Sequence, residues 1–337
     1  MTVHTPASGG TGVLGTGSYL PERVVTNAVV GARAGVSAEW IERKTGVVER
    51  RYAAEHEAAS DLAVEAAVRA LADAGAHARD LDWIVVATST PDHPQPATAA
   101  LVQHRIGARG AAAFDVNAVC AGFVAALHTC SRLLAGPGAG GGLGLVVGTE
   151  VYSRILDLTD RRTAPLFGDG AGAVVIGPVR GDRGFIGTSL RTDGHLNDLI
   201  GVTAGGSRMP ASEKSVIRGD HFFRMQGRGV REYVERELPV AVAASLEEFG
   251  VAAADVAHFV PHQANGEMLR AVAGQLGLGT ARIHLPVVRH GNTGAASIPL
   301  ALDHARRSGV PLDDEVVLLA GFGGGMTLGT TLLRWGR

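Results

Sequence analysis

The chain has 337 residues, a formal net charge of −2, 46% hydrophobic residues and 19% charged residues. This near-neutral composition is typical of a globular protein and excludes both a strongly basic nucleic-acid binder and a disordered polyelectrolyte. The length exceeds one ordinary hydrophobic core, so two cores, or one fold built by duplication, are expected. No stretch reaches the roughly 18 uninterrupted apolar residues that a membrane span requires.

The N-terminal segment 1–12 is short, polar and rich in Gly, Ser and Thr, without the basic and apolar regions of a secretory signal. It is predicted to be a disordered tail. Cys120 and Cys130 are the two cysteines, ten residues apart. Two cysteines in so long a chain do not form a disulfide framework, which favours free thiols and a reducing, cytoplasmic environment.

Apolar runs of strand length alternate along the chain with longer helical patterns, which predicts an α/β protein with a parallel or mixed sheet buried on both faces. The strand runs, in chain order, are 82–88, 143–149, 171–176, 258–261 and 315–320. The helical patterns are 58–74, 120–135, 229–249 and 265–276, and the Gly-rich segment 136–144 is expected to be a surface loop.

The two halves of the sequence share a helix–turn–strand pattern. A helix, a short turn and the strand Asp80–Val86 are matched by a second helix, a turn and the strand Asp255–Val260. This repetition indicates a duplication whose halves meet near 176–185. Duplicated α/β halves usually place their site between them.

Cys120 lies where a predicted strand gives way to an apolar, Ala-rich helix. A helix N-terminus favours the thiolate, which is the form that attacks acyl carbonyls. The alternative, equally weighted on this evidence, is a small buried hydrophobe. That second interpretation is preferred for Cys130, within the helix.

Three further segments carry groups suited to acyl chemistry. His262 follows a buried strand at its carboxyl end, where ligands bind in open α/β sheets, although a loop histidine is as well supported by this position alone. Asn292 lies in a polar turn before small residues, where it either orients a ligand oxygen or caps a helix. The glycine run 323–325 either presents backbone N–H groups to an oxyanion or forms a tight hairpin.

Taken together, these motifs resemble 3-oxoacyl-(acyl-carrier-protein) synthase III of the thiolase superfamily, from near Gly12 to Trp335. The motifs that carry the resemblance are, in order, Cys-Ala-Gly-Phe at Cys120, Gly-Asp-Gly-Ala-Gly at Gly168, Pro-His-Gln-Ala-Asn at Pro261, Arg-His-Gly-Asn-Thr at Arg289 and Gly-Phe-Gly-Gly-Gly at Gly321.

The resemblance implies a thiolase-like five-layered αβαβα fold of two duplicated halves, 13–178 and 179–337, in a homodimer. It implies that Cys120 accepts an acyl group from acyl-CoA. A malonyl thioester, malonyl-ACP or malonyl-CoA, then decarboxylates and attacks the acyl-enzyme to give a 3-oxoacyl thioester. His262 and Asn292 would stabilise the enolate, and the backbone N–H groups of Cys120 and Gly324 would form the oxyanion hole.

The resemblance also assigns binding residues. Coenzyme A would contact Trp40, Lys44, Arg161 and Asn265, with Trp40 stacking on adenine unless it only packs beneath its helix. Gln95 and Phe322 would belong to the acyl pocket, and Gln95 stands where the family often has Phe. No metal and no cofactor beyond the coenzyme A thioester substrates is expected.

Some positions depart from the family. Glu267 replaces an arginine that docks acyl carrier protein, Glu232 replaces a lysine, and a basic pair is absent at 274–275. Because carrier proteins are acidic, such reversals weaken docking unless nearby Arg228, Arg231 and Arg270 compensate. Carrier protein as a partner is therefore uncertain, and polyketide or other specialised metabolism is favoured over housekeeping fatty-acid initiation.

Two alternatives remain. An acyltransferase of the same fold would move the acyl group from Cys120 to a hydroxyl or amine, but relatives of that kind tend to replace the asparagine by an acid, and Asn292 is retained. A catalytically inert partner subunit is disfavoured because Cys120, His262 and Asn292 are all present.

Overall fold

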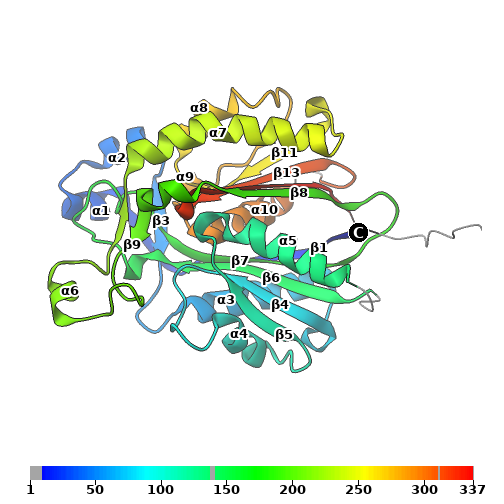
Figure 1. Ribbon diagram of the computed structural model, residues 1–337, viewed down its shortest axis with the longest axis horizontal. Coiled ribbons are helices and arrows are strands. Elements are labelled where there is room, and N and C mark those ends of the chain that lie inside the picture. Colours follow the sequence, from blue (N-terminus) through cyan, green and yellow to red (C-terminus); the bar gives the residue numbers. More distant parts are fainter. Residues whose placement is uncertain (1–9, 137–140, 310–311, 337) are drawn as a thin grey trace, which may run out of the picture.

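The computed structural model describes residues 10–136, 141–309 and 312–336. Its centre is a pair of five-stranded mixed sheets (Figure 1). The first sheet has the order β1-β7-β6-β4-β5, and the second has the order β12-β11-β13-β14-β8. The strands of the first sheet are β1 (Thr11–Tyr19), β4 (Leu81–Ala87), β5 (Ala112–Val116), β6 (Leu143–Val151) and β7 (Asp169–Pro178). Those of the second are β8 (Gly184–Thr192), β11 (Val256–Pro261), β12 (Arg282–Ile283), β13 (Val316–Gly323) and β14 (Thr327–Arg334).

The two sheets repeat one strand pattern. In the first, β5, β4 and β6 are parallel, β7 is antiparallel to β6, and β1 is antiparallel to β7. In the second, β12, β11 and β13 are parallel, and β14 and β8 follow with the same two antiparallel pairings. The first sheet ends at Pro178 and the second begins at Gly184, so each sheet draws its strands from one half of the chain.

Five layers result, with helices outside both sheets and between them (Figure 1). The outer helices are α3 (Ala59–Ala74) and α4 (Thr98–Ile106) on the first sheet, and α7 (Gly227–Glu248) and α8 (Gly266–Ala273) on the second. The central layer contains α5 (Gly122–Leu134) and α10 (Ser297–Arg307), which share one core with both sheets. The predicted αβαβα fold is confirmed.

The remaining elements are short. They comprise a hairpin of β2 (Arg23–Thr26) and β3 (Glu49–Tyr52), the strand pair β9 (Ile200–Val202) and β10 (Phe223–Met225), and four helices: α1 (Asn27–Ala34), α2 (Ala38–Thr45), α6 (Glu213–Ile217) and α9 (Val287–His290). None of the described helices is long and apolar enough to cross a bilayer.

Two local expectations need correction. The predicted tail 1–12 extends too far, because β1 begins at Thr11 and pairs with Pro178; residues 1–9 lie outside the described part of the chain. The nucleophile region is also not the first turn of a long α-helix. Cys120 lies in a separate 3-10 turn, Val119–Ala121, before α5 begins at Gly122. Of the predicted Gly-rich loop 136–144, residues 137–140 lie outside the described ranges, and residues 143 and 144 already belong to β6.

Candidate active site

Cys120 is held in a strained turn at the carboxyl end of the first sheet. The preceding residue, Val119, has φ of 48°. A β-branched side chain rarely adopts this left-handed conformation, and strain of this kind persists only where surrounding packing imposes it. Cys120 is 6% exposed and lies just before the central helix α5.

The glycine run of the second sheet passes directly beside Cys120. A Cβ added at Gly323 would lie 2.7 Å from the backbone nitrogen and the Cβ of Cys120, and one at Gly324 would lie 3.0 Å from the side chain of Val119. Only glycine therefore allows this close approach. The placement fits the predicted oxyanion hole of the Cys120 and Gly324 N–H groups.

His262 enters the same region from the second sheet. It follows the last residue of β11, its backbone N–H donates to the Ala320 carbonyl at 2.7 Å, and its ring packs edge-to-face on Phe322 at 5.2 Å between centroids. The side chain is 1% exposed. Burial lowers the pKa of His262 to about 3, partly opposed by the Gly294 backbone. The ring is therefore neutral at physiological pH and suited to donating one hydrogen bond.

Asn292 is oriented by its own loop. Its Oδ1 accepts the backbone N–H of Gly294 at 2.9 Å, which turns the amide nitrogen towards the cavity. Its backbone N–H donates to the Leu166 carbonyl at 2.7 Å, and its carbonyl accepts the N–H of Gly168 at 2.9 Å. The segment that contains the Gly168 motif thus fixes the position of Asn292, and the contact of its Oδ1 with Gly294 is also that of a turn residue.

The pKa of Cys120 differs from the expectation. Burial, followed by the charge of Glu150, raises the pKa of the thiol to about 12, although the Tyr152 hydroxyl and the local backbone N–H favour the thiolate. Desolvation outweighs these contacts because burial removes the hydration that would stabilise the anion. Burial therefore opposes the thiolate that the sequence analysis favoured, and a thiolate at Cys120 stays a prediction. Burial raises the pKa of Cys130 equally, to about 12.

A buried polar network that the sequence analysis missed lies beside Cys120. Glu150, at the end of β6, is fully buried, and its Oε1 accepts the N–H of Ser89 at 3.0 Å and the Ser89 hydroxyl at 2.9 Å. Its Oε2 accepts the Thr90 hydroxyl at 2.6 Å. Tyr152 places its hydroxyl 3.2 Å from Ser89 Oγ. A glutamate at the end of an otherwise apolar strand was the signal in the sequence.

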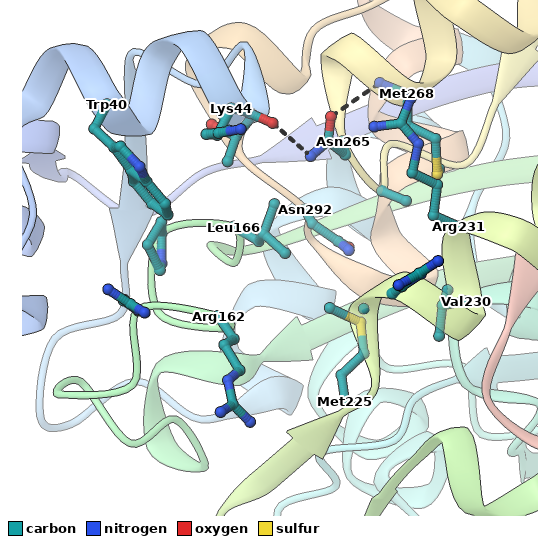
Figure 2. Close-up of a pocket in the computed structure, with 16 residues that line it drawn as sticks. Trp40, Lys44, Arg162, Leu166, Met225, Val230, Arg231, Asn265, Met268 and Asn292 are labelled. Atoms are coloured by element: carbon teal, nitrogen blue, oxygen red, sulfur yellow. Dashed lines mark hydrogen bonds between the residues drawn. The ribbon is translucent and has the colours of Figure 1, made fainter.

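A cavity of about 620 Å³ leads towards Asn292 from the surface (Figure 2). Its mouth lies between α2, the loop at 161–166 and the start of α7. Among its lining residues are five cationic side chains, Lys44, Arg161, Arg162, Arg228 and Arg231. Such a lining is suited to a phosphorylated, elongated ligand.

All four residues predicted to bind coenzyme A line this cavity: Trp40, Lys44, Arg161 and Asn265. Trp40 is half-buried and also packs on the apolar cluster beneath α2. One part of its side chain is therefore available to a ligand in the cavity, as predicted for adenine stacking, and the other part packs beneath its helix. Asn265 has a structural task as well. Its Oδ1 caps α8 through the N–H of Met268 at 3.0 Å, and its Nδ2 donates to the Lys44 carbonyl at 3.1 Å.

The two residues predicted for the acyl pocket lie in different environments. Phe322 is 2% exposed, and its ring packs against the imidazole ring of His262. Gln95 is exposed on the loop between β4 and α4 and does not line the cavity of the isolated chain. Tyr152, Phe167 and Phe223 instead form an aromatic cluster next to Cys120, with centroids 4.5 to 5.4 Å apart.

The cationic side chains proposed to compensate for lost carrier-protein contacts are paired within their own helices. Arg228 bonds Glu232 at 2.8 Å, Arg231 bonds Glu235 at 2.7 Å, and Arg270 contacts Glu267. These exposed pairs add little stability. They do reduce the positive potential at the mouth of the cavity.

Comparisons with known proteins agree with this site. The family profile described as 3-oxoacyl-[acyl-carrier-protein (ACP)] synthase III matches residues 114–194, and its C-terminal profile matches residues 246–335. The chain is 53% identical over 325 residues to acetoacetyl CoA synthase NphT7 of a Streptomyces species, covering 96% of this chain and 98% of the relative. It is 47% identical over 329 residues to a beta-ketoacyl-[acyl-carrier-protein] synthase III of Bradyrhizobium diazoefficiens, with the same coverage.

Solved structures give the same result. The 3-oxoacyl-(acyl carrier protein) synthase III of Pseudomonas aeruginosa superposes with a TM-score of 0.88 at 40% identity, over 97% of this chain and 99% of that one. A priming β-ketosynthase of a polyketide biosynthetic pathway superposes with a TM-score of 0.89 at 32% identity, over 99% of each chain. Fold, site and sequence agree: the chain belongs to the 3-oxoacyl-[acyl-carrier-protein] synthase III family of condensing acyltransferases.

Proposed function

We propose that this enzyme condenses a short acyl group, taken from acyl-CoA onto Cys120, with malonyl-CoA. Loss of carbon dioxide yields an enolate that attacks the acyl-enzyme, and the product is a 3-oxoacyl-CoA. We place this reaction in the priming of specialised metabolism, in a reducing cytoplasm, and assign the enzyme a homodimeric state.

The orientation of Asn292 carries the proposal. The Gly294 N–H occupies its oxygen, so its nitrogen is the group directed at the cavity, next to a neutral His262. Two neutral donors stabilise an enolate as negative charge develops. An acyl transfer to an alcohol instead needs a general base at the acceptor, a role that the Asn292 amide cannot fill.

The choice of malonyl-CoA over malonyl-ACP rests on charge. Arg228 and Arg231 lie at the cavity mouth, and each is paired with a glutamate one helical turn away. Docking of an acidic carrier protein depends on a positive surface that steers its approach. The relative at 53% identity, whose name specifies a coenzyme A product, supports the same choice.

The aromatic cluster supports a small acyl group. Tyr152, Phe167 and Phe223 are each at most 4% exposed and pack on one another beside Cys120. We infer from this packing that a long chain would not fit there within one subunit. Acetyl is therefore the donor group we propose. Gln95, exposed in the isolated chain, would reach an acyl pocket only across a dimer interface.

The defining experiment supplies acetyl-CoA and then malonyl-CoA to the wild-type enzyme. We expect an acetyl adduct on Cys120 by intact-protein mass spectrometry, followed by acetoacetyl-CoA and carbon dioxide in equal amounts. An adduct that is released only to alcohols or amines would establish acyl transfer instead. Failure of any adduct to form would indicate an inert subunit.

The acceptor is tested by reversing one charge on α7. Glu232→Lys should raise kcat/KM for malonyl-ACP by about tenfold through a faster encounter, and leave kcat/KM for malonyl-CoA within about twofold. Glu248→Lys, at the opposite end of the same helix, is the matched control and should change neither value. A wild type that already prefers malonyl-ACP would contradict the choice of acceptor.

A further inference from the structure

Arg50 is among the largest fully buried side chains of the described residues, and it carries a charge. It lies in β3 and is 0% exposed. Among the described residues no carboxylate forms an ion pair with it, and the neighbouring Glu49 contacts Arg289 instead, at 3.3 Å. Burial lowers the pKa of Arg50, but a guanidinium keeps its charge at neutral pH. A buried cation without a counter-charge is costly unless other polar groups compensate it.

Neutral oxygen atoms from two distant segments surround this cation. Arg50 Nη1 donates to Asn27 Oδ1 at 2.8 Å and, more distantly, to the Val25 carbonyl at 3.3 Å. Arg50 Nη2 donates to the Pro165 carbonyl at 2.7 Å. Asn27 and Pro165 lie 23 and 115 residues from Arg50 in the sequence. Because the guanidinium is planar and rigid, it sets the distance between these two segments.

Asn27 extends the contact to α2, which forms one wall of the cavity. Its side chain is buried, and Nδ2 donates to the Val47 carbonyl at 2.7 Å and to the Ala38 carbonyl at 3.5 Å. Ala38 is the first residue of α2, and Val47 lies just past its C-terminus, so one amide holds both ends of the helix. Trp40 and Lys44, both predicted to bind coenzyme A, line the cavity from this helix.

Pro165 belongs to another wall of the same cavity. With Arg161, Arg162 and Leu166 it lines the cavity on the loop at 161–166. Figure 2 shows α2 and this loop on different sides of the cavity. Arg50 is not among the lining residues, so it bonds to both walls from within the protein.

We propose that Arg50 is a positioning residue for coenzyme A: by bonding Asn27 and Pro165 at once, it fixes how far α2 stands from the loop at 161–166. The inference rests on the proposed function in assigning this cavity to coenzyme A. A cavity whose walls are fixed in advance loses less conformational freedom when the nucleotide binds. The hydrogen bonds of the Arg50 side chain reach none of the three predicted catalytic residues. Its effect therefore falls on binding and not on the chemical step.

Arg50→Met removes the guanidinium and keeps the side-chain stem, which packs close to Gly168. Acylation of Cys120 is followed alone, by rapid acid quench and intact-protein mass spectrometry, over a range of acetyl-CoA concentrations. We expect the half-saturating concentration to rise about tenfold and the rate at saturation to stay within about twofold of wild type. The dissociation constant of free coenzyme A, measured by isothermal titration calorimetry, should rise by the same factor.

A truncated donor separates positioning from a general structural role. S-acetyl-N-acetylcysteamine carries the same acetyl thioester without the nucleotide, so its use does not depend on the spacing of the two walls. Its second-order rate of acylation should therefore agree within about twofold between Arg50→Met and wild type. An enzyme that is merely destabilised would lose activity with both donors.

Arg51→Met is the matched control on the same strand. Arg51 Nη1 donates to the carbonyls of Pro21 at 3.1 Å and Glu22 at 3.2 Å, neither of which lines the cavity, so both donors should behave as with wild type. Arg50→Lys retains the charge but not the planar fork, and should fall between wild type and Arg50→Met. Asn27→Asp keeps an acceptor for Arg50 but loses the donors to α2, and should also raise the half-saturating concentration of acetyl-CoA.

An unchanged half-saturating concentration of acetyl-CoA in Arg50→Met would overturn the proposal, and so would an equal loss with both donors. If Arg50→Met does not fold, as judged by its thermal transition, wild-type values in Asn27→Asp are the contrary result. A wild type without preference for acetyl-CoA over the truncated donor would refute the assignment of the cavity, and the inference with it. A wild type that shows this preference but never condenses would refute the proposed condensation and leave the role of Arg50 intact.

Discussion

At Asn292, one backbone contact decides which end of the amide faces the substrate. Because the Gly294 N–H holds the oxygen, the nitrogen serves as a donor, and the buried His262 is a second neutral donor. We expect both groups to act on the enolate, and the backbone N–H groups of Cys120 and Gly324 to bind the oxyanion of acylation. On this assignment the two half-reactions depend on different groups.

We expect Asn292→Ala and His262→Ala each to form the Cys120 adduct at near-wild-type levels but to lose condensation by about 10²-fold, the scale of removing one oxyanion donor. Asn292→Asp should be no better, because a carboxylate repels the enolate. Adduct formation is measured by mass spectrometry and condensation by release of 3-oxoacyl-CoA. Wild-type product formation by Asn292→Ala would refute the assignment.

At the scale of an element, the glycine run after β13 determines how closely the two halves approach at Cys120. The backbone of Gly323 is extended, a conformation that any residue can adopt. Glycine is required at this position because the backbone of Cys120 lies so close to it. Its missing side chain leaves room for the backbone of Cys120 in the turn before α5. The predicted oxyanion hole would thus depend on contact between elements from opposite halves.

Gly323→Ala should slow acylation by at least about tenfold, because its Cβ would lie 2.7 Å from the Cys120 backbone and force the run away. Gly201→Ala, in β9, is the matched control. A Cβ there meets no atom within 4 Å, and its backbone is not left-handed. Equal acylation rates in both variants would show that the run is not part of the oxyanion hole.

At the scale of the whole molecule, folding buries several histidines in neutral form. Burial lowers the pKa of His262 to about 3 and those of His284 and His290 to about 4. In the unfolded chain each titrates near 6.5. Below that pH the unfolded state binds protons that the native state does not, so these histidines reduce stability as pH falls from about 6.5 towards 4. Glu150 and Asp169, whose pKa values are raised, partly offset this effect.

His290→Gln removes one of these groups. At pH 5.5 the mismatch between folded and unfolded pKa values at one such histidine destabilises the protein by about 1 kcal/mol. The difference in thermal midpoint between pH 7.5 and pH 5.5 should therefore be smaller in His290→Gln than in wild type. His195→Gln, a surface control, should leave that difference unchanged. An equal difference in all three proteins would contradict the prediction.

The sequence by itself determined the α/β class of the fold. Buried strands such as β6 and β13 are apolar on both faces, and helices with an apolar stripe separate them, so composition and periodicity sufficed for that class. The five-layered arrangement followed from the family that the motifs resemble. Motif order identified Cys120, His262 and Asn292 as candidates. It also located the cavity residues Trp40 and Lys44.

Only the tertiary structure decided the electrostatics of the site. The pKa of Cys120 depends on burial and on Glu150, which lies 30 residues away in sequence and on another strand. The hydrogen-bonded network of Glu150, Ser89 and Tyr152 joins the ends of two strands, β4 and β6, that pair only in the folded sheet. Desolvation and proximity between distant segments arise on folding, and no local pattern of residues encodes them.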